Sequence, residues 1–231
     1  MENYFFINDV DSRTVGVKCG TFPPIVIPKK RTNSIVIDGR HGNLTETDNC
    51  YESYIWTLEC YSEDKNIEQI EMFFRDAKTL RLSNNPEKVY FVRIKNQIDL
   101  SIIAEYWRNF TVVFEVQPII KSYTIYEENV IDGNHSFTVG GTFETKPIIE
   151  LEGTGNFIIT INNQNIIIND LENEKIIIDT DLKIAMIDNA NASLKTNVNY
   201  DNIKLNIGIN NISVIGEYDS LKIKYRRCYL C

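Results

Sequence analysis

The sequence predicts a mainly β protein with two β domains and one α-helix. Apolar and polar residues alternate along most of the chain, and Ile, Val, Phe and Tyr fill most apolar positions. Only one segment has helical spacing instead. The 231 residues are 43% apolar, which is enough for one large β domain or two smaller ones, each with its own core.

Residues 66–77 form the segment with helical spacing. Its apolar residues recur at intervals of three and four, and either Asp64 or Asn66 can serve as the N-cap. The alternating segments around it predict strands at Tyr54–Tyr61, Val89–Ile94 and Phe110–Val116. We therefore expect a first domain of strands with this single helix.

The composition changes between Glu127 and Asn134. Five of the six prolines and the predicted helix precede this stretch, whereas short Ile-rich runs separated by Asn, Asp and Gly follow it. Runs of this length and spacing predict a β-sandwich of about 100 residues. The expected domains are therefore 1–130 and 131–231. In the second domain, Gln164–Asn165 is predicted to form a tight hairpin turn.

The charge balance argues against a nucleic-acid partner. The chain carries 24 Lys and Arg against 32 Asp and Glu, a net charge of -8, and both halves are acidic. No stretch approaches the roughly 18 apolar residues of a membrane span, and Met1–Val10 does not resemble a signal peptide. We expect synthesis in a cytoplasm and no membrane partner. The five cysteines have no framework spacing, so most are expected to be reduced thiols.

No catalytic, cofactor-binding or metal-binding set is predicted. His41 and His135 are the only imidazoles, and both lie in segments that read as surface loops. Cys228 and Cys231 fit a Cys-x-x-Cys spacing, but zinc would need a second pair and a redox pair would need a helix N-terminus. These two cysteines are therefore interpreted as incidental thiols.

Two glycine clusters lack the sequence context of a phosphate loop. Neither 140–142 nor 153–155 opens a predicted helix or precedes a Lys-Ser or Lys-Thr pair, so both are predicted to be turns. Paired carboxylates lie between predicted strands, where acidic residues commonly solvate hairpin ends. The sequence therefore predicts a protein that is not an enzyme.

Several segments resemble, in order, the distal tail proteins of long-tailed phages with non-contractile tails. Segments of the first half match the opening strands, a glycine-containing hairpin, later strands and the point where the first domain closes: Phe5–Asn8, Arg13–Val17, Ile35–Leu44, Pro86–Arg93 and Phe110–Pro118. In the second half, Gly141–Ile149, Ile176–Thr180 and Gly208–Val214 are similar to strands of the family's galectin-like domain. The resemblance covers essentially the whole chain.

This resemblance implies a structural hub at the tail tip of a phage or prophage virion, made in the bacterial host cytoplasm. The first domains would form a homo-hexameric ring, and the galectin-like domains would point outward. The ring would join the tail tube protein to the tail-associated fibre or lysin protein, and would carry receptor-binding protein at its rim. No cofactor is implied.

The hairpin Ile37-Asp38-Gly39-Arg40-His41-Gly42 is the candidate inter-subunit arm. A protruding hairpin with glycines at its bend can lie on a neighbouring subunit, whereas an ordinary surface hairpin only connects two strands. Two other functions stay open. One is a carbohydrate-binding β-sandwich module, and the other is a cell-wall hydrolase that uses paired carboxylates.

Overall fold

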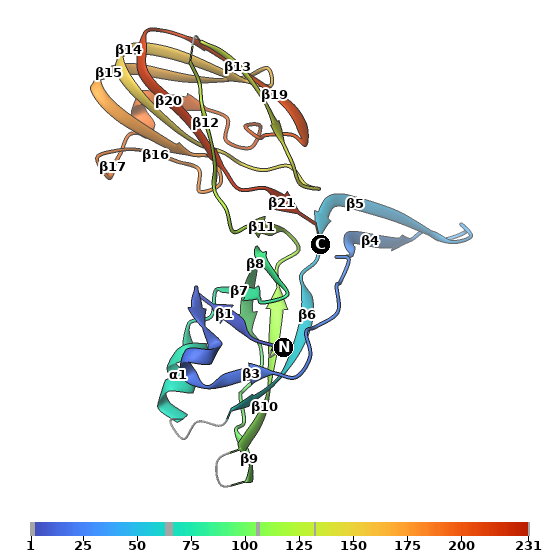
Figure 1. Cartoon of the computed structure of the whole chain (residues 1–231). Helices are drawn as coiled ribbons and strands as arrows, with labels where there is room; N and C mark the ends of the chain where they lie inside the picture. Colours follow the sequence, from blue (N-terminus) through green and yellow to red (C-terminus); the bar gives the residue numbers. More distant parts are fainter. Residues whose placement is uncertain (1–2, 63–66, 105–106, 132, 231) are drawn as a thin grey trace. The chain divides into compact units, whose positions relative to one another are not determined.

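The computed structural model describes residues 3–62, 67–104, 107–131 and 133–230. The chain forms two compact units, Met1–Tyr123 with Leu230–Cys231, and Thr124–Tyr229 (Figure 1). Both consist mainly of antiparallel strands, which confirms the predicted β fold class. The first strand of the second unit, β12 (Tyr126–Asn129), precedes the expected boundary at residue 130.

Most strands of the first unit pair in the order β2-β1-β7-β8-β10-β6-β3, with β9 beside β10 and β11 beside β8. The strands are β1 (Phe5–Ile7), β2 (Val10–Asp11), β3 (Val17–Cys19), β6 (Tyr54–Ser62), β7 (Thr79–Leu82), β8 (Asn85–Ile94), β9 (Ser101–Ala104), β10 (Trp107–Val116) and β11 (Ile120–Ser122). Two further strands, β4 (Lys30–Val36) and β5 (Asn43–Tyr51), form a separate two-stranded sheet.

Helix α1 (Ile67–Arg75) confirms the predicted helix, and it is the only α-helix among the described residues. It buries Phe73 and Phe74, whose rings lie 5.9 and 6.3 Å from that of Phe5 on β1. The Phe74 ring also lies 5.8 Å from Phe110 on β10 in an edge-to-face arrangement. The helix therefore covers one face of the sheet. Both proposed N-caps, Asp64 and Asn66, lie outside the described residues.

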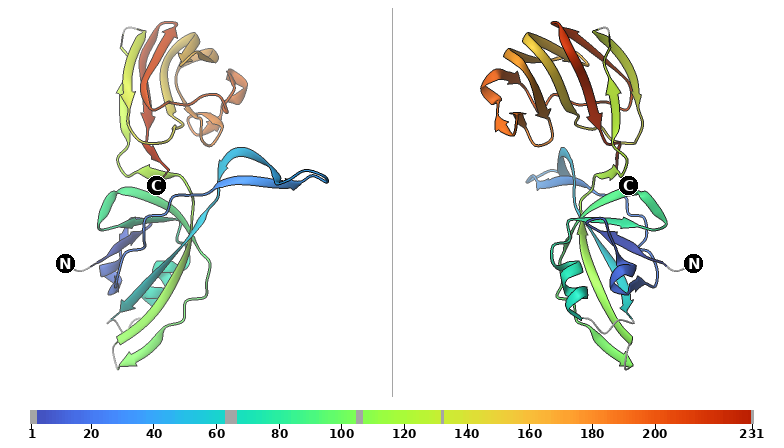
Figure 2. Two further views of the ribbon diagram at one scale, coloured as in Figure 1. Left: turned by 90° about the vertical axis from the view of Figure 1, so that its right-hand side faces the viewer. Right: turned by 60° about the vertical axis from the view of Figure 1, so that its left-hand side comes forward.

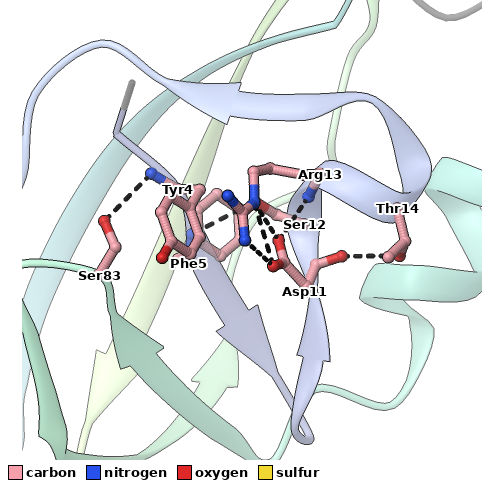
Figure 3. A network of polar contacts seen from close by, with 7 residues as sticks. All are labelled: Tyr4, Phe5, Asp11, Ser12, Arg13, Thr14 and Ser83. Carbon is pink, nitrogen blue, oxygen red and sulfur yellow. Dashed lines mark hydrogen bonds and ion pairs between the residues drawn. The ribbon is translucent and has the colours of Figure 1, made fainter. Parts of the chain in front are cut away.

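A polar network anchors the 3-10 turn η1 (Ser12–Val15) to strand β1 (Figure 3). The Arg13 guanidinium donates to the Asp11 carboxylate, with Arg13 Nη2 2.6 Å from Asp11 Oδ2. The backbone N–H of Arg13 donates to Asp11 Oδ1. The side-chain bonds from Arg13 hold the pKa of Asp11 below its ordinary value. Buried Ser12 accepts a hydrogen bond from the Phe5 N–H at 3.2 Å. This network holds η1 against strand β1.

The second unit contains a sheet in which β12, β20, β14, β15, β16 and β17 are neighbours in that order, and β13, β19 and β18 join it. Its remaining strands are β13 (Asn134–Val139), β14 (Ile148–Ile161), β15 (Gln164–Asp179), β16 (Ile184–Ile187), β17 (Ala190–Asn191), β18 (Thr196–Val198), β19 (Gly208–Ile215), β20 (Tyr218–Tyr225) and β21 (Cys228–Tyr229), and η2 (Ser193–Lys195) is a 3-10 turn.

Strands β14 and β15 belong to both layers of a sandwich. The first half of β14 pairs with β20, whereas its second half pairs with β19. Two bulges separate the halves, one between Gly153 and Thr154 and one between Gly155 and Phe157. The cluster 153–155 was predicted to be a turn, and this prediction is wrong, because the segment lies inside β14. A Cβ on Gly153 would lie 2.9 Å from buried Phe157, so glycine lets the strand bend over that ring.

The hairpin turn between β14 and β15 lies at Asn162–Asn163, two residues before the predicted Gln164–Asn165. Both asparagines have positive φ, 48° and 69°, as a two-residue type I′ turn requires. Gln164 instead begins β15 and pairs with Ile161. The short Ile-rich runs of the sequence therefore merge into two long strands.

One hydrophobic core fills the second unit. Inward residues of the first layer, such as Leu151 and Ile178, share this core with Ile159 and Ile166 of the second layer. All four have exposed fractions of 0%. The inner faces of the two layers thus pack on each other, and the polar residues of both layers are left on two outer faces.

Candidate functional site

Strands β4 and β5 form an arm that projects from the first unit (Figure 2). The arm, defined as residues 30–51, pairs antiparallel, with Val36 opposite Asn43 and Ile35 opposite Leu44. Neither strand hydrogen-bonds to any other described strand, so the arm is a sheet of two strands only. The predicted hairpin at Ile35–Leu44 is therefore confirmed as a hairpin.

The six candidate residues, 37–42, form the connection at the tip of the arm. The Arg40 N–H donates to the Ile37 carbonyl oxygen at 3.1 Å, which closes a four-residue turn. Gly39 and Gly42 both have a φ of 78°, a conformation that glycine adopts without steric cost. All six residues are exposed, and no atom lies within 4 Å of a Cβ built on either glycine. The side chains at the tip are thus exposed to solvent in the described structure.

The end of the arm exposes apolar side chains. Val36 is 75% exposed, and Ile35 and Ile37 on either side of it are about 40% exposed. The segment that leads into the arm adds Ile25 and Ile27, which are 85% and 77% exposed. Consecutive exposed aliphatic side chains such as Ile35, Val36 and Ile37 on a protruding element are typical of an interaction surface rather than of a solvated loop.

The arm lacks a hydrophobic core of its own. Every residue of β4 is exposed, and only Leu44 and Tyr51 of β5 are half-buried. An isolated two-stranded hairpin is at best marginally stable in water, because it buries too little apolar surface to offset the entropy lost on ordering. The arm therefore gains little stability from burial of its own residues.

Polar contacts across the arm are exposed and few. Asn43 Nδ2 donates to Ser34 Oγ at 2.7 Å, and near the base Arg31 Nη1 lies 3.5 Å from Asp48 Oδ2. Both partners of the ion pair are about half exposed, so solvent screens their attraction. These contacts join the two strands but do not replace a core.

The two histidines lie in different settings. His41 is exposed at the tip of the arm, as expected for a surface loop. His135 lies on strand β13, so its assignment to a loop is wrong. Its ring stacks on Phe137 with centroids 5.7 Å apart, and its Nε2 lies 3.4 Å from Glu128 Oε2. The alternation His-Ser-Phe-Thr-Val could have identified this strand. The two imidazoles belong to separate units.

Among the described residues, Cys19, Cys50, Cys60 and Cys228 form no disulfide bond. Cys231 lies outside the described residues, so the Cys-x-x-Cys pair is described only at Cys228, which is buried. Burial raises the pKa of the Cys19 thiol to about 11, which disfavours its thiolate. Gly140 and Gly141 lie in the loop after β13.

The described part of the chain holds no group of three or more His, Cys, Asp or Glu side chains that could bind a metal ion. The carboxylates with lowered pKa, such as Glu150 and Glu115, are paired with lysine or arginine on outer strand faces. Such pairs are structural and do not supply a free acid or base. None of the described helices is long and apolar enough to cross a membrane.

No family model and no curated protein sequence matches this chain. Its fold is similar to that of a solved structure, the crystal structure of the SPP1 Dit (gp 19.1) protein, described as a paradigm of the hub adsorption apparatus in phages that infect Gram-positive bacteria. The TM-score is 0.78, and the match covers 98% of both chains at 11% sequence identity. The resemblance seen in the sequence is thus confirmed at the level of fold, over both units.

Proposed function

We propose that this protein is a non-enzymatic structural component of a phage or prophage tail, a distal tail protein at the tail tip. The main supporting observation is the arm, an ordered hairpin that lacks a core and ends in exposed apolar side chains. The whole-chain similarity to the SPP1 hub protein supports the same function. The ion pairs of Glu150 and Glu115 with lysine or arginine on strand faces are structural, which agrees with it.

The arm suits a ring assembly in which each subunit offers two different surfaces. Its apolar end, around Val36, lies on the next subunit, whose own arm reaches the following one. Such heterologous contacts close into a ring when the rotation per subunit divides a full turn. In our proposal the ring is a homo-hexamer, the first domain (1–130) forms it, and the second domain (131–231) is a galectin-like β-sandwich that points outward.

The ring then joins the tail tube protein to the tail-associated fibre or lysin protein, and carries receptor-binding protein at its rim. These partners, the baseplate location and synthesis in the host cytoplasm belong to the proposal through the family resemblance. The acidic net charge of -8 agrees with partners other than nucleic acid.

Light scattering of the purified chain across a concentration series tests this function. We expect a mass that approaches about six times the 26.7 kDa chain. The variant Val36→Asp, which places a charge in the apolar end of the arm, should remain a monomer. The matched control is Leu194→Asp, because Leu194 is fully exposed in the second unit and lies outside the arm.

Two outcomes would contradict the proposal. A wild-type chain that stays monomeric up to about 50 µM would exclude a ring that forms without partners. Assembly of Val36→Asp equal to that of the wild type would show that the arm does not hold the ring. Circular dichroism of both variants establishes that neither substitution unfolds the chain.

A further inference from the structure

The two outer faces of the second unit differ in charge. In the layer formed by β13, β19, β18 and the adjoining halves of β14 and β15, no residue is Asp, Glu, Lys or Arg across 134–139, 156–161, 164–169, 196–198 and 208–215. We name the outer surface of this layer the neutral face. The opposite layer carries ion pairs that join β12, β14, β15 and β20. A charge-free face is unusual in a chain of which 24% is charged.

Hydrogen-bonding side chains line up across the neutral face. Asn134 on β13 pairs with Ser213 on β19, which pairs with Thr160 on β14, and Thr160 pairs with Asn165 on β15. In the next row Ser136 is opposite Asn211. Because these residues are directly opposite one another on adjacent strands, their side chains lie on the same side of the sheet.

These rows line a hollow of about 570 Å³. The turn at Asn162–Asn163 and Asn206 complete its wall, and no charged side chain lines it among the described residues. A hollow of this volume accommodates a ligand of one or two sugar rings, and it opens to solvent at the surface.

A buried asparagine holds the wall of the hollow in place. Asn210 is 0% exposed, and its Nδ2 donates to the carbonyl oxygens of Asn206 and Gly208 at 2.8 and 3.0 Å. Its Oδ1 accepts from the Asn206 N–H at 2.8 Å and from Asn162 Nδ2 at 2.6 Å. Asn162 Oδ1 in turn accepts from the Asn211 N–H at 3.1 Å. All polar groups of Asn210 are thus satisfied, and the lining is fixed before any ligand arrives.

The hollow also keeps unused hydrogen-bonding capacity. Within the described part of the chain, the side chains of Asn134, Asn163 and Ser213 make no hydrogen bond. Asn211 uses only its Oδ1, which accepts from Ser136 Oγ at 2.6 Å, so its amide group remains able to donate. Amides and hydroxyls together present both donors and acceptors without a net charge.

This chemistry matches a sugar better than it matches an ion or a protein. Each sugar hydroxyl both donates and accepts, as these side chains do, whereas a phosphate or a carboxylate would call for Arg or Lys. Protein interfaces are usually anchored by Trp, Tyr or Arg, and the outward positions of this face carry none of them. The exposed Ile209 and Ile215, on the same strand, offer aliphatic surface for the apolar side of a sugar ring.

We propose that the neutral face of the second unit binds an uncharged saccharide in this hollow. The site lacks an aromatic ring for stacking, so a single site binds weakly, in the millimolar range. Binding by one chain needs neither the arm nor a second subunit. This inference can therefore hold or fail separately from the proposed ring.

Saturation-transfer NMR with the full chain tests the site. The probes are neutral oligosaccharides of glucose, galactose and N-acetylhexosamines at about 10 mM, with sialylated and uronic-acid oligosaccharides at the same concentration. We expect binding of at least one neutral probe and at least tenfold weaker binding of acidic ones. Asn211→Asp should weaken binding at least tenfold, because it replaces a donor with a charge. Asn129→Asp, the same change on the opposite outer face, should leave binding unchanged.

Several results would overturn this inference. The absence of saturation transfer to every neutral probe at 10 mM, or equal binding of acidic probes, would exclude a neutral saccharide site. Unchanged binding in Asn211→Asp would place the ligand elsewhere. Loss of chain assembly in Asn211→Asp, without saccharide binding in the wild type, would show that a protein covers the face. The monomeric Val36→Asp variant should bind the probes as the wild type does, which separates this test from that of the ring.

Discussion

The two long hairpins of this protein, the arm and β14–β15, differ in how much apolar surface they bury. In β14–β15, residues such as Ile159, Ile166 and Ile178 are 0% exposed, whereas Val36 at the end of the arm is 75% exposed. The inward side of β14–β15 packs on a core shared by both layers, and the arm has no such neighbour among the described residues. Hairpins hold their shape largely through burial, so the arm gains little stability from its own packing, which agrees with the proposed contact with a second molecule.

The largest expected difference between the two hairpins concerns truncated aliphatic side chains. Ile159→Ala should lower the free energy of unfolding of the second unit by about 2 to 5 kcal/mol, because it leaves a cavity in a closed core. Val36→Ala should change the free energy of unfolding by less than about 0.5 kcal/mol, because that side chain is already in water. Urea denaturation at a concentration where the chain is monomeric measures both.

Ile159→Ala and Val36→Ala serve as controls for each other, because both shorten a β-branched residue on a strand. A loss of more than about 1 kcal/mol in Val36→Ala would mean that the arm packs on its own chain, and the contrast with β14–β15 would fail. A small loss in Ile159→Ala would instead show that the core of the second unit can collapse around the gap.

A smaller effect is expected for the ion pairs on the charged outer face of β14. Burial disfavours the charged form of Glu150, but hydrogen bonds from Lys175 at 2.6 Å and Lys224 at 2.7 Å hold its pKa below the ordinary value. Glu127 and Lys222 face the same cluster from β12 and β20. Glu150→Gln should lower the free energy of unfolding by about 1 to 3 kcal/mol at neutral pH, because two lysines lose a charged acceptor.

The effect of Glu150→Gln should depend on pH with a definite sign. Because the folded pKa lies below the ordinary value of about 4.5, the carboxylate stabilises the fold above that pH and loses this contribution as pH falls through the folded pKa. The difference between variant and wild type should therefore shrink in acid, as measured by urea denaturation from pH 7 to pH 3. Glu152→Gln is the matched control, because Glu152 is exposed on the same strand. An undiminished difference at pH 3 would exclude the charge as its source.

Local patterns were sufficient to predict much of the fold. The spacing of Ile70, Phe73 and Phe74 identified the helix, because one face of a helix must bury its apolar residues. Alternation identified β6 and β10, whose inward residues alternate with exposed ones. The hairpin of the arm was predicted from its resemblance to the family's glycine-containing hairpin, and its two glycines have a φ of 78°, which glycine adopts without steric cost.

Other features depended on contacts between distant residues. The bulges of β14 follow from the packing of Phe157 on Gly153 and Gly216, so the sequence alone suggested separate short strands. The tight turn was misplaced by two residues, because every residue of Asn162–Asn165 is polar. The neutral face exists only through the pairing of β13 with β19, about 75 residues later in the chain. The position of Ile25 and Ile27 outside any strand could have been predicted from the local sequence, because prolines at both ends of their segment disfavour a strand.

The smallest effect is expected for the ion pair of the arm. Arg31 and Asp48 lie 3.5 Å apart and are about half exposed, in contrast to Glu150, whose side chain is 10% exposed. Arg31→Gln, made in the monomeric Val36→Asp chain, should change the free energy of unfolding by less than about 0.5 kcal/mol, because solvent screens exposed pairs. Urea denaturation at low and at high salt measures this. A loss above about 1 kcal/mol that disappears in salt would show that charge supports the arm in the absence of a core. If no such loss is measured, charge does not stabilise the arm. The proposed contact with a neighbouring subunit then remains as the source of the arm's stability.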